Sequence, residues 1–173
     1  GTLLACDADK FRMKELFRAQ NLPTPPFATR NYPKPLYEQP GLWLVKSAIY
    51  HGSFCIRHEN VSDDPDFLLR LMQQYENGGL WFAERYLPGR EFFIGMIGQR
   101  GHDPELLPET ELTFHPDYFK GERRPFLTED GKWEEDGAEF KAIGARYGEL
   151  AADDPLKQHL QQLAIRSWHA LDL

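Results

Sequence analysis

Three stretches of the chain repeat apolar residues at helical spacing and predict helices. The first covers residues 10–20, where Asp7 or Asp9 suits the N-cap. Pro23 lies beyond its end and stops it. The apolar stripe of this helix consists of Met13, Leu16 and Phe17.

The other two predicted helices share a start pattern, an aspartate followed by a proline. Asp64 and Pro65 open a helix that runs to an Asn-Gly-Gly stop at residues 77–79. Asp154 and Pro155 open a helix near the end of the sequence. The expected buried stripes are Leu68, Leu71, Met72 and Tyr75 in the former, and Leu156, Leu160, Leu163, Ser167 and Leu171 in the latter.

Shorter runs of apolar and aromatic residues predict strands. Residues 41–45 predict a strand closed by Lys46, and residues 53–56 predict the second strand of a hairpin. Residues 81–97 form two extended runs joined by a Leu-Pro-Gly breaker at 87–89, which reverses or kinks the chain. Alternating residues in the second run fall on one face, as in a strand.

The order of these elements predicts the fold class. A helix lies between the predicted hairpin and the extended runs at 81–97. One helix can then cover a small antiparallel sheet on one face. We therefore predict an α+β fold with small antiparallel sheets and covering helices.

Composition favours a packed globular protein. The chain has 173 residues, of which 41% are hydrophobic and 13% aromatic, enough for a sizeable core. Its formal net charge of -7 argues against binding to the phosphate backbone of nucleic acid. No apolar run approaches the about 20 residues of a membrane span, and no signal peptide is recognisable. We therefore expect a cytoplasmic protein with no nucleic-acid and no membrane partner.

The stretch from residue 99 to 152 carries many Pro and Gly residues among charged ones. It predicts loops with a short strand at 109–114. Pairs of His, Glu and Asp residues occur in it, but their spacing matches no metal site, and we assign them to a solvated surface. These pairs are His102 with Asp103, Glu109 with Glu111, and His115 with Asp117.

A lysine at the end of an apolar strand, followed by a Gly-Ser turn, is compatible with a phosphate site but is a weak signal by itself. Lys46 supplies a fixed cation, and the small residues Gly52 and Ser53 let backbone N–H groups approach an anion. A Gly-Ser pair in a hairpin is most often only a turn, so the pattern alone leaves both interpretations open. His51 in the same loop is expected to be an ordinary loop histidine.

Two carboxylates, Glu84 and Glu91, flank the Leu-Pro-Gly breaker within aromatic strands. Residue types alone favour a solvated position for them, or ion pairs with Arg85 and Arg90. Lys10 raises a related question, because the helix dipole disfavours a cation in the first turn. A nearby anion would resolve that conflict.

Taken in order, these patterns resemble an ATP-grasp ligase of the D-alanine–D-alanine ligase-like branch. The strongest matches are the Val-Lys pair at 45–46 with the Gly-Ser pair at 52–53, and Glu-Arg-Tyr-Leu-Pro-Gly-Arg-Glu at 84–91. The Asp-Lys pair at 9–10, which opens a helix, and the Gly-Lys-Trp-acidic segment at 131–136 extend the match.

The resemblance implies that the protein binds ATP with Mg²⁺, and it gives roles to individual residues. A hinge strand would hold the adenine through Arg85, Tyr86 and Leu87. Glu84 or Glu91 would hydrogen-bond adenine or ribose groups, which replaces the surface interpretation of both carboxylates. No catalytic residue is assigned. The phosphates, under a hairpin lid, would meet Lys10, Lys46, Ser53 and Lys132.

The resemblance also implies a domain organisation. Residues 1–27 would form a lead-in helix and Pro-rich connector, residues 28–87 the small or lid subdomain, and residues 88–173 an incomplete large subdomain. The family's N-terminal substrate domain and its C-terminal metal-binding segment have no counterpart in the sequence. We therefore expect no metal ligands in this chain and little or no activity from it alone.

The parent reaction would be an ATP-dependent carboxylate–amine ligation through an acyl phosphate, with a small amino acid or carboxylate as substrate. Homodimerisation is left open. The alternative is a nucleotide-binding or structural module with an ATP-grasp-like fold and no chemistry of its own. A further alternative is an interaction domain in which Lys46, Glu84, Glu91 and Lys132 are surface charges.

Overall fold

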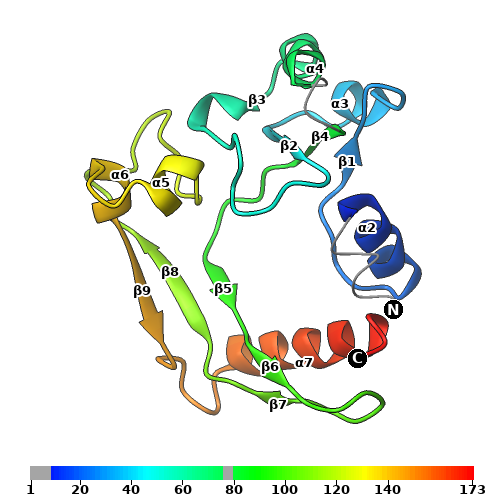
Figure 1. Cartoon of the computed structure of the whole chain (residues 1–173), viewed down its shortest axis with the longest axis vertical. Helices are drawn as coiled ribbons and strands as arrows, with labels where there is room; N and C mark the ends of the chain where they lie inside the picture. Colours follow the sequence, from blue (N-terminus) through cyan, green and yellow to red (C-terminus); the bar gives the residue numbers. More distant parts are fainter. Residues whose placement is uncertain (1–8, 76–79) are drawn as a thin grey trace. The chain divides into compact units, whose positions relative to one another are not determined.

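The computed structural model describes residues 9–75 and 80–173 and confirms the predicted α+β class. The chain divides into two compact units, and the polypeptide passes between them several times (Figure 1). Unit 1 consists of Gly1–Thr24, Arg90–Thr113 and Gly144–Leu173, and unit 2 consists of Pro25–Gly89 and Phe114–Ile143. The predicted subdomain boundaries remain a prediction.

Unit 2 is built on an antiparallel sheet with the strand order β1-β4-β2-β3. Strands β2 and β4 form its centre and pair from Trp43 opposite Arg85 to Ser47 opposite Trp81. Successive side chains of a strand point to opposite faces, so each strand presents one set of residues to each face. The strands are β1 (Phe27–Ala28), β2 (Trp43–Ser47), β3 (Val61–Ser62) and β4 (Trp81–Arg85).

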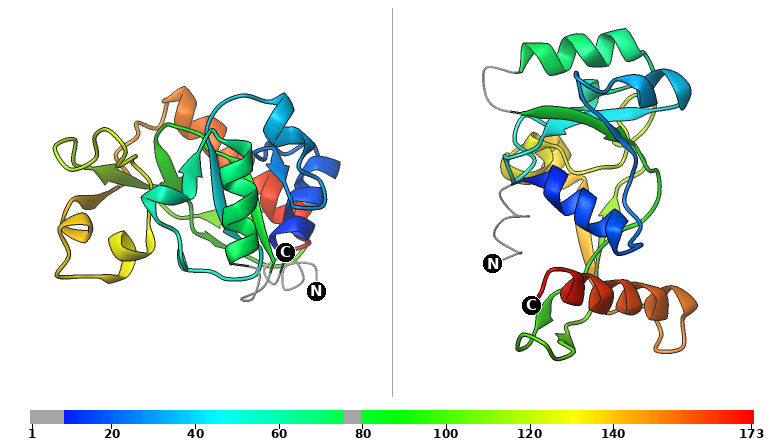
Figure 2. Two further views of the ribbon diagram at one scale, coloured as in Figure 1. Left: turned by 90° about the horizontal axis from the view of Figure 1, so that it is seen from above. Right: turned by 90° about the vertical axis from the view of Figure 1, so that its right-hand side faces the viewer.

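Helix α4 (Pro65–Gln74) covers one face of this sheet (Figure 2). Its predicted N-cap is confirmed, because the Asp64 carboxylate accepts from the N–H groups of Asp66 and Phe67. The predicted stop at residues 77–79 lies outside the described residues. The core between helix and sheet contains Leu68, Leu71 and Met72 of α4 together with Trp43, Val45, Trp81 and Ala83.

Short helices complete unit 2 and carry residues that matter for the site. They are α3 (Lys34–Glu38), the 3-10 helix η1 (His58–Asn60), α5 (Glu129–Trp133) and α6 (Ala138–Lys141).

The predicted hairpin after residue 47 is wrong. Strand β2 begins and ends two residues later than expected, so Lys46 lies inside it, and its outer partner is β3. The expected second strand at 53–56 is a series of turns, with φ of 69° at Gly52, 61° at Ser53 and 55° at Cys55. A left-handed backbone cannot continue a strand. The segment between β2 and η1 is therefore a long loop, which we call the lid loop (residues 48–57).

Within the described residues, unit 1 contains two longer helices and two small sheets. The predicted caps are confirmed, since Asp9 accepts from the Phe11 N–H and Asp154 accepts from the Leu156 N–H. The other candidate cap of the first helix, Asp7, lies outside the described residues. The helices are α2 (Lys10–Ala19) and α7 (Pro155–Ala170). The sheets are β5 (Glu91–Phe93), β8 (Thr110–Phe114) and β9 (Ile143–Tyr147) in the order β5-β8-β9, and β6 (Met96–Ile97) with β7 (Glu105–Leu106).

The Leu-Pro-Gly breaker links two different sheets. Strand β4 ends at Arg85 in unit 2, and β5 begins at Glu91 in unit 1, so the two extended runs do not pair with each other. The breaker therefore lies at a crossing between the units.

Two expectations about burial in unit 1 are wrong. The buried residues of α7 are Ala164 and Trp168, whereas the residues of the predicted stripe are only half-buried. Glu109 is also buried, with 5% of its surface exposed, although we assigned it to a solvated surface. Its carboxylate accepts from the Leu150 N–H at 2.8 Å and lies 3.4 Å from the Lys157 ammonium, which explains how it is accommodated.

None of the helices within residues 9–75 and 80–173 combines the length and the apolar character that a membrane span requires.

Candidate functional site

Two residues predicted to bind the nucleotide, Lys46 and Glu84, lie on the face of the unit 2 sheet opposite α4. Along β2, Trp43 and Val45 are buried in the core beneath that helix, so Leu44 and Lys46 point to the other face. Glu84 stands opposite Leu44 in the register of β2 and β4, which places it on the same face as Lys46. We call this surface the α4-free face and define it by Leu44, Lys46, Phe82 and Glu84.

Lys46 and Glu84 form an ion pair on this face. Their side chains are 22% and 13% exposed, so both charges are largely withdrawn from water. The Lys46 ammonium also lies 5.6 Å from the centroid of the Phe82 ring. Arg85 points elsewhere, because its guanidinium stacks 5.7 Å over Trp43. The structure thus places a cation and a carboxylate side by side, and their predicted contacts with ATP remain predictions.

The predicted adenine-binding stretch continues from the end of β4. The N–H of Arg85 donates to the Pro26 carbonyl at 2.9 Å, and the N–H of Tyr86 donates to the Leu42 carbonyl at 3.0 Å. These two donors are therefore engaged within the protein. An adenine edge could therefore bond only to the carbonyl groups of this stretch or to the backbone of the exposed Leu87. This reduces the set of backbone groups that could bind adenine.

The lid loop carries Ser53 and is hydrogen-bonded to the segment that carries Lys132. This segment comprises residues 127–133, and the Lys132 ammonium lies 5.4 Å from the centroid of the neighbouring Trp133 ring. The structure thus joins two segments, far apart in the sequence, that each carry a residue predicted to bind phosphate. The bonds join Ser53 Oγ to the Leu127 carbonyl (3.0 Å), Trp133 Nε1 to the Gly52 carbonyl (2.7 Å), and the Glu129 N–H to the Ile56 carbonyl (2.9 Å).

Position 52 favours glycine for two reasons, its backbone conformation and its close approach to Trp133. Its φ of +69° is left-handed, and a Cβ at this position would stand 3.2 Å from the Trp133 ring. The Gly-Ser turn is therefore the point at which the lid loop approaches Trp133.

The two remaining candidates lie in unit 1. Lys10 is the first residue of α2, and Glu91 is the first residue of β5, where it stands opposite Leu112. Their predicted approach to the residues of unit 2 remains a prediction.

A buried polar network adjoins the segment of Lys132 and was missed from the sequence. Its centre is Glu139 of α6, which is 9% exposed. The Thr128 hydroxyl lies 2.6 Å and the Tyr118 hydroxyl 3.4 Å from its carboxylate, and His58 Nε2 lies 3.3 Å away. Burial, and next the negative charge of Glu139, raise the pKa of Tyr118. Nothing in the charged stretch around Glu139 distinguishes it from its exposed acidic neighbours.

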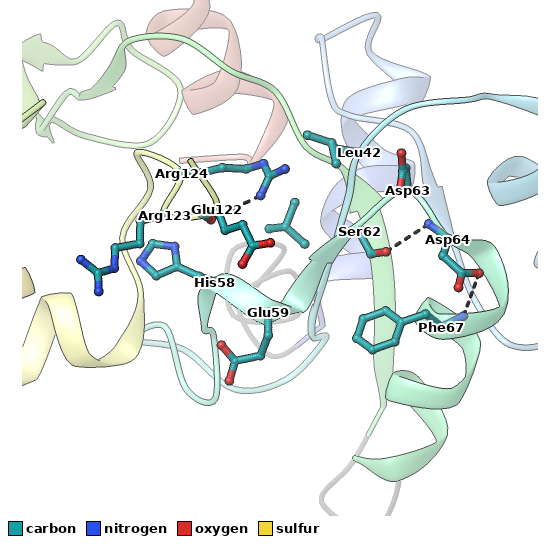
Figure 3. Close-up of a pocket in the computed structure, with 11 residues that line it drawn as sticks. Leu42, His58, Glu59, Ser62, Asp63, Asp64, Phe67, Glu122, Arg123 and Arg124 are labelled. Atoms are coloured by element: carbon teal, nitrogen blue, oxygen red, sulfur yellow. Dashed lines mark hydrogen bonds between the residues drawn. The ribbon is translucent and has the colours of Figure 1, made fainter. Parts of the chain in front are cut away.

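A pocket of about 660 Å³ opens elsewhere in unit 2 (Figure 3). Its charged residues are partly engaged with the protein itself, because Arg123 stacks 4.8 Å from the Tyr118 ring and Arg124 donates to the Glu122 carbonyl at 3.3 Å. None of the residues predicted to bind the nucleotide is among the described residues that line this pocket. We therefore assign no ligand to it. The lining consists of Leu42, His58, Glu59, Val61, Ser62, Asp63, Asp64, Phe67, Glu122, Arg123 and Arg124.

Magnesium was expected as a partner of ATP, without protein ligands in this chain. Within residues 9–75 and 80–173, no group of three or more His, Cys, Asp or Glu side chains could hold a metal ion. The described residues do not fit a magnesium site by themselves, and no step of the function below is derived through the metal.

Comparisons with known proteins place this fold. No protein-family model and no curated protein matches the sequence. The structure is similar to D-alanyl-alanine synthetase A from Vibrio cholerae, with a TM-score of 0.67, 16% identity, and coverage of 96% of this chain and 48% of that one.

Two further solved structures agree with this. They are the D-alanine–D-alanine ligase from Bacillus anthracis complexed with ATP (TM-score 0.62, 17% identity, 96% and 47% of the two chains) and the VanG D-Ala:D-Ser ligase from Enterococcus faecalis (0.63, 15%, 97% and 46%). The chain spans about half the length of these relatives, and at such low identities the likeness concerns the fold alone. The chain is therefore folded like part of a D-alanine–D-alanine ligase.

Proposed function

We propose that unit 2 binds ATP on its α4-free face, as the nucleotide-binding part of an ATP-dependent carboxylate–amine ligase. The observation that carries this proposal is the largely buried Lys46–Glu84 pair on the face of the sheet opposite α4. The similar structure from Bacillus anthracis, which was solved with ATP, supports the choice of ligand.

The ion pair explains how a nucleotide site can exist before the nucleotide arrives. An ammonium that is withdrawn from water is costly unless an anion neutralises it, and Glu84 does so for Lys46. Phosphate oxygens would supply the replacement anion on binding. The Glu84 carboxylate, which accepts hydrogen bonds only, would then serve the ribose hydroxyls or the adenine amino group.

The lid loop and Lys132 would complete the phosphate side of the site. Ser53 is fixed in a left-handed turn, and the segment that carries Lys132 is bonded to the same loop. A second cation held next to a Gly-Ser turn would share the negative charge of the triphosphate with Lys46.

In the parent protein, ATP would phosphorylate a small carboxylate or amino acid, and an amine would displace phosphate from the acyl phosphate. The residues described here would bind and orient the nucleotide, and the acceptor site would lie elsewhere. The names of the similar structures include both D-Ala-D-Ala and D-Ala:D-Ser ligases, so the substrate is left as a small amino acid. We expect this chain alone to show little or no ligase activity.

Titration calorimetry with ATP, with and without magnesium, tests this proposal. Lys46→Met and Glu84→Gln should each weaken ATP binding by about tenfold or more, because each removes a charge-assisted contact. Unit 2 also offers a matched control, the exposed Lys34–Glu38 pair at 3.3 Å, with side chains 63% and 58% exposed. Lys34→Met and Glu38→Gln should leave the affinity unchanged.

Two outcomes would contradict the proposal. One is a folded wild-type chain that binds no ATP, which would favour the structural-module alternative. The other is ATP binding that Lys46→Met and Lys34→Met weaken equally, because the site would then depend only on net charge.

A further inference from the structure

Thr128 links helix α5 to Glu139 through hydrogen bonds of its hydroxyl group. The Thr128 hydroxyl accepts the Gly131 N–H at 2.9 Å, as the N-cap of α5, and lies 2.6 Å from Oε1 of Glu139. A hydroxyl has one proton to donate, and Oε1 of Glu139 is the acceptor within reach. The lone pair that caps α5 is thus aimed by the bond between Thr128 and Glu139.

Helix α5 depends strongly on this contact. It spans only Glu129–Trp133, and a helix of this length gains little stability from its own hydrogen bonds. Gly131 lets the network lie directly against its backbone, since a Cβ there would stand 2.8 Å from Ile143 Cδ1 and 3.0 Å from Oε1 of Glu139. Lys132 is the next residue, so its backbone is set by the same contact.

The other side of the network leads back to the strand of Lys46. His58 of η1 lies 3.3 Å from Glu139 through Nε2 and packs between aromatic rings of the 119–126 segment. Asn60, in the same short helix, is fully buried and donates to the Val45 carbonyl at 3.1 Å. Val45 directly precedes Lys46 in β2. A continuous set of contacts therefore connects the two lysines proposed to bind phosphate.

We propose that Glu139 is a positioning residue that holds Lys132 in register with Lys46, and that it strengthens ATP binding without touching the nucleotide. This inference rests on the proposed function. It assigns to a buried carboxylate, which the nucleotide site itself does not use, the task of fixing the distance between two phosphate-binding cations.

A purely structural role is the competing explanation, and it predicts a different pattern. Such a role would lower stability and would weaken ATP binding regardless of whether Lys132 is present. A positioning role acts through Lys132, so its effect should vanish once the Lys132 ammonium is removed. A double-mutant cycle separates the two explanations.

The experiment measures ATP affinity by calorimetry for Glu139→Ala, Lys132→Met and the double variant, with urea unfolding to confirm that each is folded. Glu139→Ala should weaken binding by about tenfold, and by less than about twofold in the Lys132→Met background. Glu139→Gln keeps the size and an acceptor oxygen for Thr128 and should recover most of the affinity. Glu135→Gln, which changes an exposed acid three residues after Lys132, is the matched control and should bind ATP like the wild type.

A second pair of variants decides the matter if Glu139→Ala does not fold. Thr128→Val removes the hydroxyl that links Glu139 to α5, whereas Thr128→Ser retains it. We expect weaker ATP binding for Thr128→Val and near wild-type binding for Thr128→Ser.

The failures are distinguishable. If the wild-type chain binds no ATP, the proposed function and this inference fall together. This inference alone is overturned if the wild-type chain and Glu139→Ala bind ATP equally tightly. It is also overturned if the losses of binding free energy caused by Glu139→Ala and Lys132→Met simply add in the double variant.

Discussion

Glu109 shows how single residues of this chain accommodate buried charge. Burial alone would raise the pKa of its carboxyl, but hydrogen bonds from the backbone and from Lys157, together with the lysine charge, outweigh burial and lower it. Glu111 behaves similarly, because the guanidinium of Arg90 hydrogen-bonds its carboxylate and lowers its pKa. Both carboxylates are therefore held in the ionised form by partners that only the folded chain supplies.

The lowered pKa of Glu109 predicts a pH dependence of stability. An acid whose pKa falls on folding contributes stability above its unfolded pKa, and this contribution is lost as pH falls through the folded pKa. Glu109→Gln should lower the free energy of unfolding by about 2 kcal/mol at pH 7, because its amide would turn a donor toward Lys157. The gap to the wild type should close below about pH 4.

Urea unfolding at several pH values between 7 and 3 measures this gap. The control is Glu149→Gln, which changes an exposed acid of the same unit whose side chain is 60% exposed. A gap that is constant over the pH range, or equal for both variants, would contradict the assignment.

Such residues also mark the limit of what the sequence predicts. Lys46 and Glu84 could be proposed as nucleotide contacts because they lie in the short motifs that carry the family resemblance. The burial of Glu109 and Glu139 could not be predicted, since it depends on partners such as Leu150 and Thr128 that tertiary folding brings to them. Local residue type carries no information about those partners.

At the scale of elements, the three helices with an aspartate cap were predicted because their boundaries are set locally. The short helices α3, α5 and α6 were missed, the last two within the stretch 99–152 that we predicted as loops. Asp9, Asp64 and Asp154 each cap the helix that the sequence assigns to them. The second strand of the hairpin was misplaced because pairing is non-local. Strand β3 has only two residues and no alternating pattern, and it lies beyond a loop whose left-handed residues were not recognisable.

The cap of α4 gives a prediction at this scale. Asp64→Ala should lower the free energy of unfolding by about 1 kcal/mol, because the N–H groups of Asp66 and Phe67 lose their acceptor. Asp63→Ala is the matched control, since Asp63 is exposed and adjacent but is not the cap. Urea unfolding should show a loss for the first variant only, and equal losses would argue against the cap.

At the scale of the whole molecule, the chain forms two units from interleaved segments. The fold class followed from the order of helices and strands, but the likeness to D-alanine–D-alanine ligases was reached through short motifs and their order. With identities of 15% to 17%, composition and periodicity could not have singled out that fold. The pairing of the lid loop with the Lys132 segment, which is a contact between distant parts of unit 2, became visible only in the structure.

In the proposed function, ATP binds on the α4-free face beneath the lid loop, where it should protect the surrounding backbone amides. Amide hydrogen exchange with and without ATP, resolved by residue, tests this most directly. ATP addition should slow amide exchange in β2, in the lid loop, around residues 84–87 and in α5. Slower exchange confined to the pocket around residues 58–64 and 122–124, or no change despite saturating ATP, would contradict it.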